Sequence, residues 1–293
     1  MKNNIIAIVT PVGNEIESIE VMYDKLCETR PDTWHRWITV IDSSCQDGSE
    51  AILRKLAQYD SRIIVLHIGQ SAGLAAAYIR GIQHAIKLNA AKIIEVDVGH
   101  PVHLIEKFVE ALNNFPLVVG TRVKGGKFIN VPLRRRLLSK IGTLLSHLVL
   151  QLPFTDCTSG LQGFTRQVAK AIPFEQFQST GHFYQTEFKF YCQSLPFMEI
   201  PFIYVGTKSS IKILAIKESL YVLFYLLKQR RYLLLPGNYT PISDNNIELL
   251  TSIQQDLKQL IGNEKYIISH CKLQLVVNRI IARLVQLIEK ELK

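Results

Sequence analysis

Two carboxylates lie two residues apart at the end of an apolar segment, in Glu95-Val96-Asp97. Side chains two apart on a strand point to the same side. The pair could therefore hold a divalent cation, Mg²⁺ or Mn²⁺, because such cations take oxygen ligands. A cation there would bridge a diphosphate and neutralise the charge that develops on a leaving nucleotide. The alternative interpretation of this segment alone is a solvated strand terminus.

A second group of residues could bind a phosphate. Arg135 and Ser139 are four apart on a predicted helix and so share one face, and Arg122 precedes that helix. Cationic forks and hydroxyl donors position a phosphate nucleophile, which is already ionised at neutral pH. The arginines at 134–136 oppose the dipole of the helix that they begin, and a bound anion would offset this. The alternative is a solvated helix start.

The elements that must position these residues alternate between strand and helix. Strands are predicted at 5–10, 37–41, 62–68, 92–96 and 117–120, and helices at 18–29, 50–59, 72–88 and 102–112. Ser18 could cap the first helix. This order predicts an α/β fold with a doubly wound parallel sheet. Ligands of such sheets bind beyond the carboxyl ends of the strands, which here are followed by the loops 11–15, 42–49, 95–101 and 121–127.

The rest of the chain is predicted to be mainly helical. Residues 128–200 are expected to form helices and loops, with a long apolar helix at 133–152, before a strand at 198–205. A helix at 214–232 carries apolar, aromatic and basic residues. That composition suits either the headgroup region of a membrane surface or packing within the core.

Composition and length limit the classes of protein that fit. The chain has 293 residues, of which 47% are hydrophobic, and a net charge of +9, which favours anionic partners. No helix-turn-helix, zinc-finger or aromatic RNA-binding signature is found, so we expect no nucleic-acid partner. Five widely spaced cysteines without a CxxC suit a reducing, cytoplasmic compartment. The longest apolar stretch, Leu220–Leu227, is shorter than the roughly 20 residues of a membrane span.

Two regions are expected along the chain. Residues 1–235 form the main domain, and 236–293 form a helical C-terminal extension. An apolar stripe at helical period within 264–292 could mediate a homo-oligomer, which would cover surface that a monomer exposes.

The motif loops resemble those of family-two glycosyltransferases. The matching positions are Pro11/Asn14/Glu15, Asp42/Asp47/Gly48/Ser49, Gly73/Leu74/Ala77 and Glu95/Asp97/His100/Pro101. The resemblance implies the GT-A fold, a Rossmann-like, mostly parallel sheet flanked by helices.

Further motifs are similar to those of the polyprenyl-phosphate (dolichol-phosphate) mannose and glucose synthases. They are Gly120-Thr121-Arg122, Gly125-Gly126, Arg134–Ser139, Asp156–Phe164, Gly181–Glu187 and Glu199-Ile200-Pro201. This similarity implies an inverting transferase that moves a hexose from a nucleoside diphosphate sugar to a polyprenyl phosphate, on the cytoplasmic face of a membrane, in cell-envelope polysaccharide or glycolipid synthesis.

The resemblance also implies roles for individual residues. The nucleotide sugar would contact Pro11, Glu15, Ile41, Asp42, Glu95, Val96, Asp97, Arg122 and Lys212. The metal ligands would be Glu95 and Asp97. The catalytic residues would be Asp97, Arg122, Arg135 and Ser139. His100, a lone histidine in a loop, is expected to be structural.

Three departures from the family pattern keep alternatives open. Ser43 stands where the family has a second aspartate, Glu95 is the longer acid, and Gly99 replaces a residue that is often polar. One alternative is a family-two transferase with a soluble or glycan acceptor. Another is a catalytically silent homologue that binds nucleotide sugars.

Overall fold

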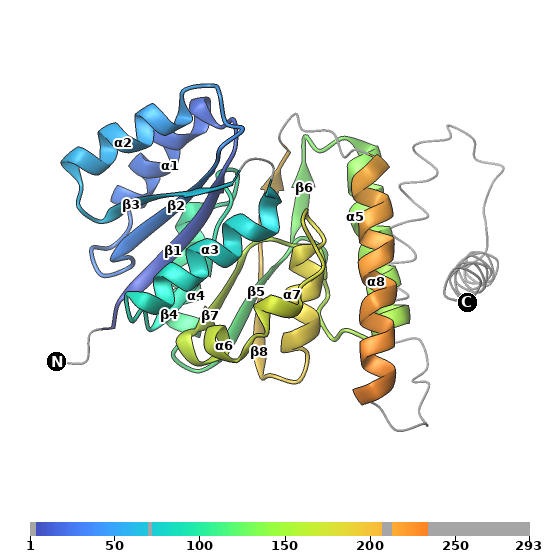
Figure 1. Cartoon of the computed structure of the whole chain (residues 1–293). Helices are drawn as coiled ribbons and strands as arrows, with labels where there is room; N and C mark the ends of the chain where they lie inside the picture. Colours follow the sequence, from blue (N-terminus) through green and yellow to red (C-terminus); the bar gives the residue numbers. More distant parts are fainter. Residues whose placement is uncertain (1–3, 70–71, 207–212, 234–293) are drawn as a thin grey trace.

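The computed structural model describes residues 4–69, 72–206 and 213–233 (Figure 1). The extension predicted at 236–293 and the candidate residue Lys212 lie outside the described residues. No helix in the described ranges is long and apolar enough to cross a membrane.

A seven-stranded sheet in the order β3-β2-β1-β4-β7-β5-β8 forms the centre of the fold. Its strands are β1 (Ile6–Val12), β2 (Arg36–Asp42), β3 (Ile63–Ile68), β4 (Lys92–Glu95), β5 (Leu117–Thr121), β7 (Gln162–Thr165) and β8 (Phe197–Pro201). Every pairing is parallel except those of β7, which lies antiparallel between β4 and β5. The mostly parallel sheet is confirmed, but the sequence analysis missed β7, whose four residues carry no clear strand pattern.

Helices cover both faces of the sheet. The helices are α1 (Ile16–Cys27), α2 (Ser49–Tyr59), α3 (Gly73–Lys87), α4 (Ile105–Ala111), α5 (Leu133–Leu145), α6 (Arg166–Ala171), α7 (Tyr184–Cys192) and α8 (Ile213–Leu233). Of these, α5 and α8 lie at one end of the molecule and not on the faces of the sheet. Successive strand residues bury opposite sides: Ile8 packs in one core with Phe108 of α4, and Val9 in the other with Tyr78 of α3. The apolar strands are therefore buried on both faces, as expected for a parallel sheet.

Several predicted boundaries are corrected. Ser18 lies inside α1, which Glu15 caps through its backbone carbonyl. The helix expected at 133–152 changes at Ser146 from α5 to a π-helical turn, η2 (Ser146–Leu150). The strand expected at 198–205 is broken at Phe202, so that β8 stays in the main sheet and β9 (Ile203–Val205) pairs in parallel with β6 (Lys127–Ile129).

The helix predicted at 214–232 is present as α8, and several of its apolar residues face inward, although Tyr221 is exposed. Val222, Leu223 and Leu226 are buried, and the helix packs against η2 and α7. Figure 1 shows α5 and α8 side by side at one end of the molecule. Packing within the protein therefore accounts for these apolar residues of α8.

Candidate active site

The loops predicted to gather at one edge of the sheet do so. Strands β1, β2, β4 and β5 run in the same direction, and Val12 of β1 is in register with Ile41 of β2. Pro11 is half-buried, whereas Ile41 and Val96 are buried in the core. Ile41 and Val96 therefore present backbone rather than side chains to this edge.

The loop after β2 is held in a fixed shape by Asp47. Its carboxylate accepts hydrogen bonds from the backbone of Ile16 at 2.9 Å and of Ser49 at 2.9 Å. Burial opposes the charge, but a hydrogen bond from the Ser49 hydroxyl at 2.6 Å and these two backbone bonds outweigh it and lower the pKa of Asp47 to about 2. Asp42, at the start of the loop, accepts a hydrogen bond from the backbone of Ser44 at 2.8 Å. The loop thus fixes Asp42 beside β1.

Asp97 presents its carboxylate to open space at this edge. The side chain is 41% exposed, and its Oδ1 accepts a hydrogen bond from the Tyr78 hydroxyl. The Nδ1 atom of His100 accepts a hydrogen bond from the Asp97 backbone at 2.9 Å, and its Nε2 lies 3.6 Å from Oδ2. Burial lowers the pKa of His100 although Asp97 opposes this. His100 is therefore a neutral residue that positions Asp97.

Glu95 is on the same side of the chain, but its carboxylate lies in the interior. It is 0% exposed, and its two oxygens accept hydrogen bonds from Tyr184 at 2.8 Å and from Gln162 at 2.9 Å. Burial raises the pKa of Glu95 to about 8 despite these bonds. The predicted metal pair is therefore corrected. Glu95 does not lie at the surface beside Asp97, because its carboxylate is buried against Tyr184 and Gln162.

The acids that remain at the edge fit a cation shared with a ligand. Burial raises the pKa of Glu15, and the charges of Asp97 and Asp47 raise it further, so these carboxylates lie within electrostatic reach of one another. Among the described residues, no group of three or more His, Cys, Asp or Glu could enclose a metal. The arrangement fits a cation that Asp97 holds and that takes its other ligands from a diphosphate and water.

Arg122, at the end of β5, is fixed by a bidentate ion pair. Its Nε donates to Oδ2 of Asp156 at 2.7 Å, and Nη2 donates to Oδ1 at 2.9 Å. Nη2 also donates to the hydroxyls of Ser139 at 3.1 Å and Thr158 at 2.7 Å. Arg122 and Ser139 are therefore in direct contact, as predicted. Asp156 and Thr158, which had no predicted role, also hold Arg122 in place.

The loop carrying Asp156 and Thr158 is held in place by hydrogen bonds with Glu199 and Lys189. Glu199 is on β8, and its carboxylate accepts hydrogen bonds from the backbone and hydroxyl of Thr155 at 2.7 and 2.9 Å. Lys189 is fully buried, and its ammonium donates to the Ser159 carbonyl at 2.7 Å. Residues from β8 and α7 therefore hold in place the loop that contacts Arg122.

Arg135 completes the basic end of a cavity of about 210 Å³. Its Nη2 donates to the Tyr204 hydroxyl at 3.0 Å, and both Arg135 and Arg122 lie over the Tyr204 ring. Ser139 and Thr158 also line this end. The structure thus brings Arg122, Arg135 and Ser139 together, as predicted.

Much of the remaining lining of the same cavity is apolar and comes from two helices. The lining residues there are Leu138, Ile141 and Leu145 of α5 and Ile216, Leu220 and Leu223 of α8. A cavity with cations and hydroxyls at one end and aliphatic side chains along its wall fits an amphiphile with an anionic head.

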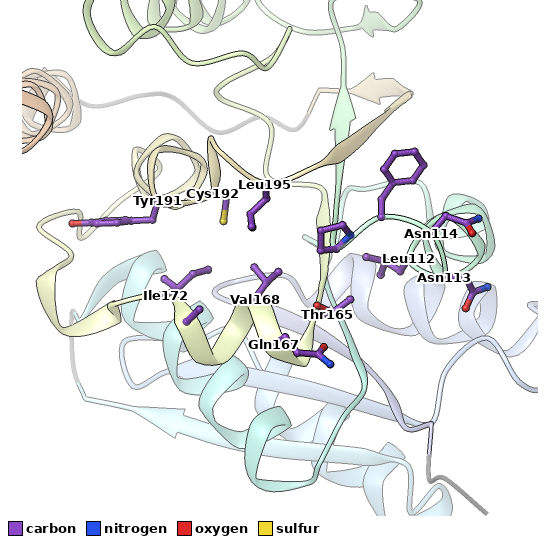
Figure 2. Close-up of a pocket in the computed structure, with 13 residues that line it drawn as sticks. Leu112, Asn113, Asn114, Thr165, Gln167, Val168, Ile172, Tyr191, Cys192 and Leu195 are labelled. Atoms are coloured by element: carbon purple, nitrogen blue, oxygen red, sulfur yellow. The ribbon is translucent and has the colours of Figure 1, made fainter. Parts of the chain in front are cut away.

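A second cavity, of about 490 Å³, lies at the other edge of the sheet (Figure 2). It is formed near the start of β5 by Pro116, Thr165, Val168, Ile172 and Leu195. None of the predicted site residues lines it, so we assign the chemistry to the first edge.

Several residues of the site were not predicted from the sequence. Tyr78 and Tyr204 gave no signal, because an aromatic residue at helical or strand spacing reads as core. Asp156 and Thr158 belong to the Asp156–Phe164 motif, but no role was predicted for them. Their signal was the pairing of an acid with a hydroxyl two residues later, shortly before a glycine.

The chain matches known proteins over most of this region. Residues 7–172 match the model of the family described as Glycosyl transferase family 2. An undecaprenyl-phosphate mannosyltransferase of Micrococcus luteus is 29% identical over 202 residues, which are 67% of this chain and 82% of the relative. A polyprenol monophosphomannose synthase of Mycolicibacterium smegmatis is 28% identical, over 61% of this chain and 69% of the relative.

Solved structures show the same fold. The glucosyl-3-phosphoglycerate synthase of Mycobacterium tuberculosis aligns with a TM-score of 0.58 at 16% identity, covering 80% of this chain and 83% of that one. Another structure of this synthase, with Mn²⁺, uridine diphosphate and glucosyl-3-phosphoglycerate, has a TM-score of 0.54 at 17% identity, covering 80% and 82%.

Proposed function

Since the chain belongs to glycosyl transferase family 2, we propose that it transfers a hexose from a nucleoside diphosphate sugar to a polyprenyl phosphate. Relatives whose names specify undecaprenyl-phosphate mannose transfer and polyprenol monophosphomannose synthesis support this assignment. We further propose that the transfer inverts the anomeric centre.

The observation that carries the proposal is the cavity between α5 and α8. Its polar end has two guanidinium groups and two hydroxyls, from Arg122, Arg135, Ser139 and Thr158, and these are the donors that a phosphate accepts. Its aliphatic wall would take the first isoprene units of a lipid chain. A sugar hydroxyl acceptor would need neither feature.

The donor would bind at the neighbouring strand ends. Pro11, Glu15 and Asp42 would contact the nucleoside, with backbone contributions from Ile41 and Val96. Asp97 would hold a divalent cation, Mg²⁺ or Mn²⁺, and the bound cation supplies positive charge to the diphosphate as it leaves. Glu95 would act through Tyr184 and Gln162 to shape this edge from within.

The reaction needs little acid or base chemistry. An oxygen of the acceptor phosphate, held by Arg122 and Arg135, attacks the anomeric carbon from the side opposite the diphosphate. The new carbon–oxygen bond forms as the bond to the nucleoside diphosphate breaks, and the bond electrons leave with the diphosphate. Because the attacking phosphate is already ionised, positioning and charge stabilisation supply the rate enhancement.

A soluble phosphorylated acceptor is the second candidate. A structure of the Mycobacterium tuberculosis synthase contains phosphoglyceric acid, a small phosphate-bearing molecule, together with uridine diphosphate, and this supports the second candidate. The basic end of the cavity would suit either acceptor. The aliphatic wall favours the lipid.

A direct comparison of acceptors tests the proposal. The purified chain would receive a radiolabelled nucleotide sugar, Mn²⁺ and either a short polyprenyl phosphate or phosphoglycerate. In the reaction with polyprenyl phosphate, we expect the label to enter the organic phase with the lipid. In the reaction with phosphoglycerate, we expect the label to remain on the nucleotide sugar. Label on phosphoglycerate alone would establish the second candidate.

A further inference from the structure

The two-stranded sheet β6–β9 presents different residues on its two faces. Its register pairs Lys127 with Ile203, Phe128 with Tyr204 and Ile129 with Val205. Side chains of paired residues share a face, and those of successive residues alternate. One face therefore carries Lys127, Ile129, Ile203 and Val205, and we call it the ribbon face.

The ribbon face gathers exposed aliphatic side chains. Ile129 is 41% exposed, and Ile203 and Val205 are each 50% exposed. Eight large apolar side chains are exposed in the described part of the chain, and three of them are on this one short face. Scattered exposed residues need no explanation, but a contiguous set on an edge ribbon indicates a surface that contacts something.

The surroundings of the ribbon face are basic. Lys127 belongs to it, and the nearby positions Lys124 and Arg134, in the segments that enter and leave β6, are also exposed. Aliphatic residues rimmed by cations fit an anionic lipid surface, where apolar groups enter the headgroup region and cations face phosphates.

The other face of the ribbon lines the acceptor cavity. Phe128 and Tyr204 are among its lining residues, and Tyr204 contacts both Arg122 and Arg135. The ribbon is tied to the site because the backbone of Lys127 donates to the Phe202 carbonyl at 3.1 Å, and Phe202 donates to that of Thr121 at 2.9 Å. One strand layer thus separates the ribbon face from the phosphate-binding groups.

From this relationship we infer that the ribbon face docks on an anionic phospholipid bilayer, and so places the acceptor cavity at headgroup level. The inference rests on the proposed function, because a lipid acceptor explains why the cavity lies directly behind such a surface. A polyprenyl phosphate could then enter the cavity while its distal chain stays in the bilayer.

Vesicle sedimentation tests the inference without donor or acceptor. The full chain would be mixed with vesicles of phosphatidylcholine alone or of equal parts phosphatidylcholine and phosphatidylglycerol. We expect binding to the anionic vesicles at low salt, with release as salt screens the cationic contribution. Ile203→Ser and Val205→Ser should each weaken binding about tenfold, because apolar area no longer enters the lipid.

Val21→Ser is the matched control. Val21 is also 50% exposed, but it is on α1, away from the ribbon. It should bind vesicles like the unaltered chain, and circular dichroism would confirm that all variants are folded. Equal binding by the ribbon variants and the unaltered chain would overturn the inference. A failure of the unaltered chain to bind anionic vesicles would also overturn the inference. A dimer that Val205→Ser disrupts, found together with that failure, would show that the ribbon face contacts a second copy of the chain instead.

Activity on a short, water-soluble polyprenyl phosphate separates this inference from the proposed function. Val205→Ser should retain that activity, because the substrate needs no bilayer. If the unaltered chain lacked it, the proposed function would fail even where vesicle binding held.

Discussion

Arg122 and Asp156 form an ion pair that is almost removed from water, with side chains 11% and 1% exposed and Nε to Oδ2 at 2.7 Å. Burial raises the pKa of such a carboxyl, but Arg122 outweighs that effect and holds the pKa of Asp156 at about 2. Asp156 in turn outweighs the cost of burying Arg122 and raises its pKa. Each charge therefore depends on the other, and the guanidinium that faces the cavity cannot reorient freely.

Replacing Asp156 by Asn should destabilise the protein and weaken acceptor use together. Removing one partner of a buried pair leaves an uncompensated charge, which costs about 3 kcal/mol. Urea unfolding would measure the loss. Asp60→Asn is the control, because Asp60 pairs with Arg62 at 2.7 Å but the arginine is 36% exposed. Similar losses in both variants would contradict the special position of Asp156.

The Arg122–Asp156 pair should also make stability depend on acidity. The pKa of Asp156 is depressed from 3.8, so the charged form is favoured by folding. Its contribution is present above about pH 4 and is lost as pH falls toward about pH 2. Unfolding of the unaltered chain across this window should show a loss that Asp156→Asn lacks. Parallel curves for the two proteins would contradict the assigned pairing.

Asp97→Asn and Glu95→Gln should differ sharply in activity. Asp97 faces the donor edge, and loss of its charge should lower transfer by about 100-fold or more at saturating metal. Glu95 is buried with a pKa of about 8, so Gln replaces a group that is largely uncharged at neutral pH. We expect Glu95→Gln to stay within about tenfold of the unaltered chain. Steady-state kinetics would measure the activity of both variants. An equal loss of activity in Glu95→Gln and Asp97→Asn would indicate that Glu95 is a metal ligand after all.

Glu95 should leave its own signature on stability. Its pKa is raised from 4.5, so the folded chain keeps a proton that the unfolded chain releases. The contribution is full below about pH 4.5 and is lost as pH rises through about pH 8. The unaltered chain should therefore lose stability over that window relative to Glu95→Gln. An unchanged difference between the two proteins from about pH 5 to about pH 8 would contradict the burial of a titrating carboxyl.

Arg135→Ala should raise the KM for the phosphorylated acceptor about tenfold or more while the KM for the nucleotide sugar changes little. Arg135 is held over Tyr204 at the basic end of the cavity. Arg134→Ala is the matched control when the acceptor is the short, water-soluble polyprenyl phosphate, because Arg134 is the exposed preceding residue and does not line the cavity. If Arg135→Ala impaired the donor equally, the acceptor site would have been misplaced.

The sequence predicted the sheet edge well, because strand ends and loop polarity are local features. Asp97, Arg122, Arg135 and Ser139 lie where the loops and helix spacing indicated. The sequence could not predict that Glu95 is buried whereas Asp97 is exposed. A two-residue spacing fixes the side of the strand but not the depth, and the burial of Glu95 arises from Tyr184 and Gln162, which come from α7 and β7.

The sequence also could not predict the pairing of β6 with β9 or the apolar wall of the cavity. Two strands of three residues, about 75 positions apart, carry too short a pattern to predict a pairing. The inward direction of Leu220 and Leu223 depends on where α8 packs. That position is a matter of tertiary contact with η2 and α7.

Photochemical cross-linking of the acceptor tests the central claim most directly. A polyprenyl phosphate with a photoreactive group on its first isoprene unit would be irradiated with the full chain, and the labelled peptides would be identified by mass spectrometry. The account predicts cross-links to α5 and α8, at Leu145, Leu220 or Leu223, that excess unlabelled polyprenyl phosphate abolishes. Competed cross-links confined to the second cavity, at Val168, Ile172 or Leu195, would contradict it.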